Sequence, residues 1–432
     1  MRLGLLGNHG VFRFGRTQGE GLFYDFANGQ VIPSQFTFTR GPSDGNAWSV
    51  NSSGNWIESA ANVARFDNTF PAPINARGLL MEGQRSNVLR NPRGEGAVVG
   101  VIGSGGALPT NWSASSLGTR EIVATGSEFG LQYVDIRQSG TGGAAFEWFF
   151  EASNFALAAV GQTWSASLFF RLIGGSFAGW ARSPNLVMYE FPSTALSSVS
   201  TSLSSSITRP TVTRTLNQAT TTSVQHRLNF ATPPVGAWDF TIRIYSPQIE
   251  QAAFSSTPIF PPASSLITST RAADLLSGLL SGLNIGSSGA GTYLIEISIP
   301  QAAPAGTSQT LIQIDDGGAS NRFGIRNSAG SSLLDAYRVT AGALLTSTAV
   351  SFTANTVVTC GISVDGSGSI LFSSNGSAPV SLSGAPVSGL TTFRVGSSSG
   401  AATTAFSYFR KMRIIQRAFS SSELQNATAA AL

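Results

Sequence analysis

The sequence predicts an all-β protein made of antiparallel β-sandwich domains. Hydrophobic residues make up 42% of the chain but charged residues only 11%, so Ser, Thr, Gly, Asn and Gln must cover most of the surface. Short alternating or apolar runs recur between clusters of Gly, Ser, Asn and Pro, which is the pattern of sandwiches. Helical periodicity is almost absent. The best helix candidate is the segment 420–430, where Ser420 or Ser421 would cap the first turn and Glu423 lies within it.

The length and the changes in composition predict how the chain is divided. A chain of 432 residues is too long for one compact core and suggests two or three domains. The last of the seven tryptophans is Trp238. Residues 275–291 (LLSGLLSGLNIGSSGAG) have the composition of a Gly/Ser linker, and the Gly-rich stretch 91–105 marks a softer boundary. We therefore expect three regions: an N-terminal region at 1–95, a middle sandwich at 96–275 and a C-terminal sandwich at 285–432.

The individual elements are short strands that follow one another along the chain. In the middle sandwich the expected strands are 131–137, 145–150, 163–172, 185–191, 224–230 and 238–245. In the C-terminal sandwich they are 291–299, 310–314, 322–327, 332–340, 356–364, 369–374, 392–395 and 406–415. The Ser/Thr-rich tract 193–223 stands apart by its low complexity. We expect ordered strands with solvated faces there, because Thr and Val favour a pleated strand.

Composition argues against several classes of protein. The longest apolar runs, such as 168–173, fall far short of the ~20 residues that a membrane-spanning helix needs. Lys411 is the only lysine and the arginines are scattered singly, whereas nucleic-acid binding requires clustered basic residues. Cys360 is the single cysteine, so no intramolecular disulfide is expected, and its apolar neighbours indicate a small buried residue. The N-terminus MRLGLLGNHGVFRFGR lacks the features of a signal peptide, which predicts synthesis in the cytoplasm.

The acidic residues do not predict an enzyme. A glycosidase needs two carboxylates set ~5–10 Å apart across the scissile bond. The best strand for such a pair, YLIEISI at 293–299, has Glu296 but then Ser298 in place of a second acid. Asp315 and Asp316 are adjacent and are followed by two glycines, which predicts a turn. We therefore expect a protein that binds rather than cleaves.

The histidines do not predict a hydrolase either. A serine or cysteine hydrolase usually needs a histidine base, and the chain has only His9 and His226. His226 lies in VQHRLNF, where alternation places it on one face with Val224 and Leu228 and places Arg227 with its polar neighbours on the other. A histidine packed in the interior or facing a partner is the expected outcome.

Three segments resemble those of tailed-phage structural proteins. FTFTRG (36–41), SAANVARFD (59–67) and ARGLLMEGQRSNVL (76–89) resemble a segment of phage fibre proteins, except that Met81 stands where that family has isoleucine. YSPQIEQAAFSSTPIFPPASSLITSTRAAD (245–274) is similar to the end of a carbohydrate-binding-type jelly roll in the same proteins. The stretch from Gly291, with its closing RKMRIIQRAFSSSELQNAT, resembles a concanavalin A-like (laminin G-like) sandwich.

This resemblance implies a tail fibre, head spike or similar structural protein of a bacteriophage or gene transfer agent. The implied location is the virion surface, after synthesis in the host cytoplasm. The implied partners are capsid or tail proteins and host surface polysaccharide. The implied assembly is a homo-oligomer, by default a trimer, with a pentamer as the alternative at a capsid fivefold vertex. Arg2, Arg13 and Arg16 precede the first carboxylate, at Glu20, and would dock an extended arm on an acidic capsid surface, unless this stretch is only a frayed terminus.

Sugar binding relies on aromatic platforms with polar side chains nearby. Trp148, Trp164 and Trp238 lie inside strand patterns, which favours core packing. Trp180 lies in a Gly-rich connection instead, where an indole is either exposed or caps the end of the sandwich. The candidate glycan-binding residues are Trp180, Arg182, Asn185 and Tyr189 in the middle sandwich and Asn321, Arg322 and Tyr337 in the C-terminal one.

No cofactor is expected, except that a calcium ion is a candidate ligand. Laminin G-like sandwiches often hold a calcium ion with oxygen ligands from loops, and Asp315, Asp316 and Asp335 are the candidates here, although turn formation explains them equally well. The leading hypothesis is thus a non-enzymatic virion protein that adsorbs to host polysaccharide. The alternatives are a capsid-decorating protein without glycan binding and a polysaccharide depolymerase.

Overall fold

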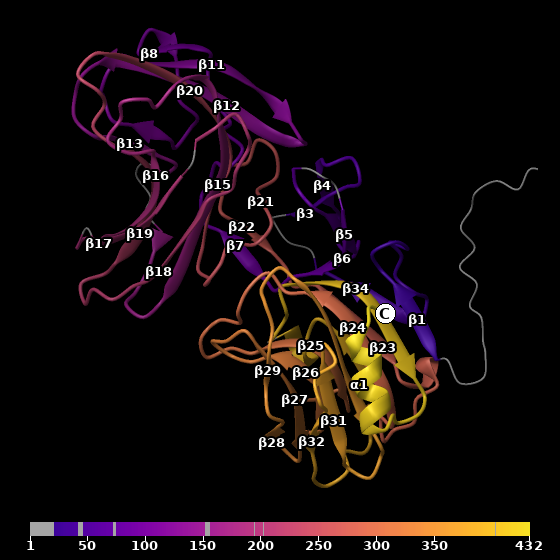
Figure 1. Ribbon diagram of the computed structural model, residues 1–432. Coiled ribbons are helices and arrows are strands. Elements are labelled where there is room, and N and C mark those ends of the chain that lie inside the picture. Colours follow the sequence, from indigo (N-terminus) through magenta and orange to yellow (C-terminus); the bar gives the residue numbers. More distant parts are fainter. Residues whose placement is uncertain are drawn as a thin grey trace, which may run out of the picture.

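The computed structural model describes residues 21–41, 46–71, 75–151, 156–193, 195–201, 203–401 and 403–432. Almost all regular structure in these residues is β, apart from the helix α1 (Ser421–Ala429) and the 3-10 turns η1 (Ser281–Leu283) and η2 (Ser399–Ala401). Figure 1 shows two β bodies, one coloured magenta and one orange to yellow. The all-β prediction is confirmed. No helix in the described part of the chain is long and apolar enough to cross a membrane.

The C-terminal sandwich packs two eight-stranded sheets face to face. Sheet 1 has the order β32 (Val380–Leu382), β31 (Ile370–Ser374), β30 (Val357–Val364), β24 (Gly291–Ser298), β34 (Ser407–Ile415), β6 (Ala76–Met81) and β5 (Arg65–Asn68), with β1 (Leu22–Asp25) also paired to β34. Sheet 2 has the order β2 (Phe36–Thr39), β23 (Leu275–Leu279), β33 (Thr392–Val395), β25 (Gln309–Asp315), β26 (Arg322–Asn327), β27 (Leu333–Thr340) and β28 (Ala343–Thr346), with β29 (Val350–Ser351) also paired to β27.

One hydrophobic core fills the space between these sheets. Ile295 and Cys360 of sheet 1 and Ile312 and Phe393 of sheet 2 belong to it, which confirms Cys360 as a small buried residue. All eight residues of β24 are buried, because α1 covers its outer side through Leu424. The helix begins with the expected cap: the Ser420 hydroxyl accepts from the Glu423 N–H, and the Glu423 carboxylate accepts from the Ser420 N–H.

The second sandwich has its own two sheets. Sheet 3 has the order β18 (Thr211–Thr215), β15 (Thr163–Gly175), β20 (Ala237–Glu250), β12 (Leu131–Thr141), β11 (Thr119–Glu128), β8 (Gly100–Ile102) and β9 (Gly105–Gly106). Sheet 4 has the order β10 (Ser113–Ala114), β13 (Phe146–Phe149), β19 (Ser223–Phe230), β16 (Asn185–Phe191) and β17 (Ala195–Ser200), with β14 (Ala156–Leu157) also paired to β19. Trp148, Trp164 and Trp238 are buried between the sheets, as expected.

The Ser/Thr-rich tract supplies the edge strands of this sandwich. β17 lies at the edge of sheet 4 and β18 at the edge of sheet 3. Along β17, exposed and half-buried residues alternate, so one face is solvated, as the sequence predicts. The Arg214 side chain of β18 anchors the tract, because its Nε donates to the buried Glu190 carboxylate at 2.7 Å.

The two sandwiches do not simply follow one another along the chain. β1, β5 and β6 pair within sheet 1 and β2 pairs within sheet 2, so the described part of the N-terminal region contributes strands to the C-terminal sandwich. The chain then leaves through β7 (Arg85–Asn87), builds sheets 3 and 4, and returns through β22 (Ser269–Arg271), which pairs with β7. The middle sandwich is thus inserted into the C-terminal one, and we call it the inserted sandwich. Arg2, Arg13 and Arg16 of the expected arm lie outside the described residues.

The segment 275–291, expected to be a linker, is ordered structure in the core. β23 pairs with both β2 and β33, and Leu276, Leu280 and Leu283 are buried. Only alternate positions of LLSGL point inward, and one of them is Gly278, so the apolar signal is diluted by small residues. This dilution gave the segment the composition of a linker.

A buried network of charges joins the two sandwiches where the chain crosses between them. Arg65 is buried and bonds Glu82 at 2.6 Å and also Asp274. Arg40 bonds Asp274 at 3.1 Å, and Arg271 lies 3.1 Å from Glu82. These five residues are all the charged members of the FTFTRG, VARFD, MEG and TRAAD segments, apart from Asp67, and these segments carry the resemblance to phage proteins. Sequence segments up to 234 residues apart therefore meet at one junction.

An aromatic contact adds to this junction. A small sheet of β21 (Ile259–Phe260), β3 (Asn46–Val50) and β4 (Trp56–Ser59) packs against the outer side of sheet 3. Trp56 contacts Phe169 of β15 edge-on, with ring centroids 5.7 Å apart, and Trp48 contacts Phe260 at 5.0 Å. The inserted sandwich is therefore held by the β7–β22 ribbon, by the charge network and by this aromatic cluster.

Candidate functional site

The outer face of sheet 4 gathers the residues best suited to bind a ligand. Alternation along β13, β16 and β19 sends Phe146, Leu186 and Leu228 into the core. The intervening residues therefore lie on the opposite face, which is the outer one. We call this set the sheet 4 face; its members are Glu147, Phe149, Asn185, Tyr189, Phe191, Gln225, Arg227 and Asn229. The register places Glu147 and Asn185 on either side of Asn229, and Phe149 beside Arg227.

Arg227 lies at the centre of the sheet 4 face. Its guanidinium carbon is 4.1 Å from the centroid of the Tyr189 ring, 4.8 Å from that of Phe149 and 5.2 Å from that of Phe191. Its terminal nitrogen bonds the Glu147 carboxylate at 2.7 Å, and its Nε donates to the Gln225 side chain at 2.7 Å. Cation–π contacts and a charge-assisted hydrogen bond thus fix three half-buried rings around one cation.

Glu147 is the hydrogen-bond acceptor that organises the polar part of the face. Besides Arg227, it accepts from the Tyr189 hydroxyl at 3.0 Å and from the Asn229 amide at 3.1 Å. Burial is the main cause that raises the pKa of the Tyr189 hydroxyl, and the neighbouring Glu147 carboxylate raises it further. Tyr189 therefore stays a neutral donor across the physiological pH range. The three donors, Arg227, Tyr189 and Asn229, hold the Glu147 carboxylate in a fixed position on the face.

Arg182 and Asn185 lie at the end of the sheet 4 face. The exposed guanidinium of Arg182 donates to the Asn229 side-chain oxygen and, at 3.3 Å, to the Ser183 carbonyl. Asn185 accepts from the Ser200 hydroxyl at 3.2 Å across the β16–β17 pair. Three of the four sequence-predicted residues of this sandwich, Arg182, Asn185 and Tyr189, are thus brought to one face.

Trp180, the fourth, lies elsewhere. Its ring is half-buried and contacts Phe177 at 5.0 Å, Trp238 at 5.5 Å and Phe240 at 5.8 Å between ring centroids. The indole therefore caps one end of the sandwich core, which was the alternative expectation for this residue. Its hydrophobic packing explains its place in the Gly-rich connection.

Sequence reasoning did not assign Glu147 and Arg227, although both are central to the face. Alternation in VQHRLNF does place Arg227 opposite His226, and this prediction is confirmed, because His226 is buried beside Phe150 with ring centroids 4.9 Å apart. The missing signal was the pairing of β13 with β19, which brings Glu147 to Arg227 from 80 residues away.

The C-terminal candidates do not form a comparable surface. The Tyr337 ring is buried, with its hydroxyl donating to the Gln313 side chain at 2.7 Å, so it is placed as a packed residue rather than an exposed platform. Asn321 is engaged in a turn, donating to Asp316 at 2.9 Å and accepting from the Ala341 N–H at 3.1 Å. Arg322 is half-buried at the start of β26.

The three calcium candidates have separate partners. Asp315 bonds Arg394 at 2.7 Å, and Asp335 bonds Arg326 at 2.9 Å. Asp316 accepts from the Gly318 N–H at 2.8 Å, which confirms the expected turn. Across the described residues, no group of three or more His, Cys, Asp or Glu side chains is arranged to hold a metal ion.

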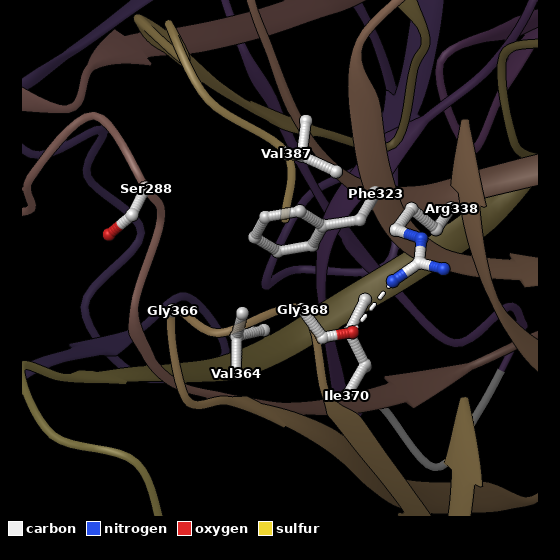
Figure 2. A pocket seen from close by; sticks show the side chains of 8 residues that line it. All are labelled: Ser288, Phe323, Arg338, Val364, Gly366, Gly368, Ile370 and Val387. Carbon is white, nitrogen blue, oxygen red and sulfur yellow. Dashed lines mark hydrogen bonds between the residues drawn. The ribbon is translucent and has the colours of Figure 1, made fainter. Parts of the chain in front are cut away.

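A small pocket opens at one end of the C-terminal sandwich (Figure 2). Its floor includes Phe323, Val364 and Ile370, and the buried Arg338 reaches its wall, where it donates to the Gly368 carbonyl at 2.6 Å and the Ser383 carbonyl at 3.0 Å. The pocket has a volume of about 10 Å³, far below the roughly 300 Å³ at which ligand pockets begin. A Cβ at Gly384 would lie 1.5 Å from the Arg338 guanidinium, so only glycine leaves room for this arginine.

Comparisons with known proteins give structural likenesses at low TM-scores. No protein-family model matches the sequence, and no curated protein matches it. The tripod of the bacteriophage Tuc2009 baseplate has a TM-score of 0.29 at 11% identity, covering 75% of this chain and 99% of that one. The CBM40 domain of the Ruminococcus gnavus IT-sialidase has a TM-score of 0.27 at 18% identity, covering 32% and 83%. The CBM22 tandem of Paenibacillus barcinonensis Xyn10C has a TM-score of 0.24 at 8% identity, covering 78% and 97%.

Proposed function

We propose that this chain is a surface protein of a phage-like particle that binds host cell-surface polysaccharide through the sheet 4 face. The observation that carries the proposal is the cluster of three half-buried rings around Arg227, bordered by the polar side chains of Glu147, Asn185 and Asn229. Sugar rings offer apolar C–H faces edged by hydroxyl groups. A surface that combines aromatic rings with fixed donors and acceptors matches both features.

The same face supports binding rather than cleavage. Hydrolysis of a glycosidic bond needs a carboxylic acid and a second carboxylate. Glu147 is bound by Arg227, Tyr189 and Asn229, and no second carboxylate among the described residues takes part in this cluster. A single carboxylate held by three donors lacks the second acid that this reaction needs.

The particle context of the proposal rests on the sequence segments that resemble phage fibre and spike proteins. Charged residues of these segments form the buried network where the chain crosses between the sandwiches. A homo-oligomer, with a trimer as the default, would present several sheet 4 faces together. Weak single contacts would then give strong attachment through avidity.

The test is binding to an array of bacterial capsular and O-antigen polysaccharides, with Tyr189→Ala as the variant. Tyr133→Ala is the matched control, because Tyr133 also stacks under an arginine, Arg243 at 3.5 Å, but on the outer face of sheet 3. Tyr189→Ala should weaken binding about ten-fold or more, since an aromatic contact with its hydroxyl is lost. Tyr133→Ala should bind as the unaltered protein does.

Three results would contradict the proposal. Binding that Tyr189→Ala leaves unchanged would place the glycan site elsewhere, and no binding to any polysaccharide would favour a capsid-decorating role. New reducing ends, measured in the same mixtures, would indicate a depolymerase.

A further inference from the structure

The arginines of the sheet 4 face differ in how their charge is balanced. Arg227 is paired with Glu147 at 2.7 Å. Arg182 is exposed, and its partners are the neutral Asn229 oxygen and the Ser183 carbonyl; within the described residues it has no carboxylate partner. The face therefore carries one positive charge that the protein itself does not neutralise.

Several other arginines of the inserted sandwich are neutralised, whereas Arg120 and Arg209 bond the Ala114 carbonyl and the Ser167 hydroxyl. Arg137 bonds Asp239 at 2.6 Å, Arg171 bonds Glu128 at 2.7 Å, and Arg214 bonds Glu190. On the sheet 4 face, Arg182 thus contrasts with the paired Arg227. An unpaired guanidinium on a binding face retains both the charge and the forked donors that match a carboxylate.

Asn229 ties Arg182 to the rest of the face. Its side-chain oxygen accepts from Arg182 while its amide donates to Glu147, which also binds Tyr189. The charge of Arg182 reaches the Tyr189 hydroxyl, where it acts to lower the pKa against the larger effect of burial. The guanidinium is therefore held beside the aromatic rings rather than at a separate place on the surface.

We infer that the sheet 4 face selects acidic glycans, with a sugar carboxylate bound by Arg182 and the sugar ring against Tyr189. This inference rests on the proposed function and names its ligand class. Neutral groups at the same end of the face, Asn185 and Ser200, would contact hydroxyls of the acidic residue or its neighbour. Because the contact is charged and exposed, binding should weaken as salt rises.

The experiment compares acidic polysaccharides with their carboxyl-reduced counterparts. The probes are colominic acid, polygalacturonate and hyaluronan, each beside the neutral polymer made by reducing its carboxylates to alcohols. The unaltered protein should bind at least one acidic polymer about ten-fold more tightly than its reduced form. Arg182→Gln should remove this preference, while Arg137→Gln, which changes a paired arginine on sheet 3, should keep it.

The outcomes separate the inference from the proposed function. Equal binding to acidic and reduced polymers, or an acid preference that Arg182→Gln leaves intact, would overturn the inference while the glycan-binding proposal stands. Binding only to neutral glycans of the bacterial array would overturn it in the same way. Absence of binding to every polymer in both sets would remove the proposed function itself.

Discussion

At the scale of single residues, the interior of the inserted sandwich contains a histidine with no hydrogen-bond partner. Neither ring nitrogen of His226 is bonded to any described group, and its neighbours are Phe150 and the apolar core. Burial lowers the pKa of His226 to about 3. The imidazole is therefore neutral in the folded protein, although it would take up a proton in the unfolded chain near its ordinary pKa of about 6.5.

This residue should make the protein sensitive to acid. The unfolded state binds more protons than the folded state between about pH 6.5 and pH 3, so stability is complete above that window and is lost as the pH falls through it. At pH 5 the loss from this group should be about 2 kcal/mol. This loss is the difference between the free energies of unfolding measured in urea at pH 7.5 and at pH 5. The His226→Phe variant should lose less stability between the two pH values than the unaltered protein, and an identical loss would show that other groups cause it.

At the scale of elements, the buried charge network fixes how strands β5 and β6 meet the returning chain before β23. Arg65 bonds Glu82 and Asp274 with no exposure to solvent. Replacing it with glutamine would leave two buried carboxylates without their shared cation. We expect Arg65→Gln to lower the free energy of unfolding by about 3–5 kcal/mol, as for other broken buried pairs.

The control for this prediction is an exposed pair. Arg137→Gln removes the contact with Asp239, in which both side chains are 46% exposed, and should lower stability far less than Arg65→Gln does. Chemical unfolding of both variants at the same pH gives the comparison. Similar changes in the free energy of unfolding for the two variants would mean that the buried charge network contributes little to stability.

The sequence predicted most elements but not the way they combine. The alternation in VQHRLNF and the tryptophans inside strand patterns identified β19 and the core correctly, because burial on one face leaves a period of two in the sequence. The network of Arg40, Arg65 and Asp274 could not be derived, since its members are separated by up to 234 residues and only the fold brings them together. The Glu147–Arg227 pair was missed for the same reason, and Trp180 showed that a Gly-rich setting does not by itself expose an indole.

At the scale of the whole molecule, the insertion makes the C-terminal sandwich depend on strands from before residue 95. A fragment of residues 285–432, the domain that composition suggests, would lack β1, β2, β5, β6 and β23. Core side chains such as Tyr293 and Phe393 would lose Phe36, Leu79 and Leu276 as neighbours. We expect this fragment to aggregate or to unfold without a cooperative transition.

A chain that respects the insertion should behave differently. Residues 21–87 and 269–432 can be joined by an Asn-Gly turn, because Asn87 and Ser269 are partners in the β7–β22 pair. This chain keeps every strand of sheets 1 and 2 and should unfold cooperatively, as followed by circular dichroism. A cooperative transition for 285–432 alone, at the same temperature, would show that the early strands are dispensable.

The chain leaves the C-terminal sandwich through β7 and returns to it through the neighbouring strand β22. This arrangement has a mechanical consequence. A cell that drags on polysaccharide bound to the inserted sandwich would load two covalent connections in parallel, so that each would bear part of the tension. Because both connections lie at the same end, the pull would not draw the two ends of the inserted sandwich apart. The inserted sandwich would thus withstand shear without being unfolded by the two connections that hold it.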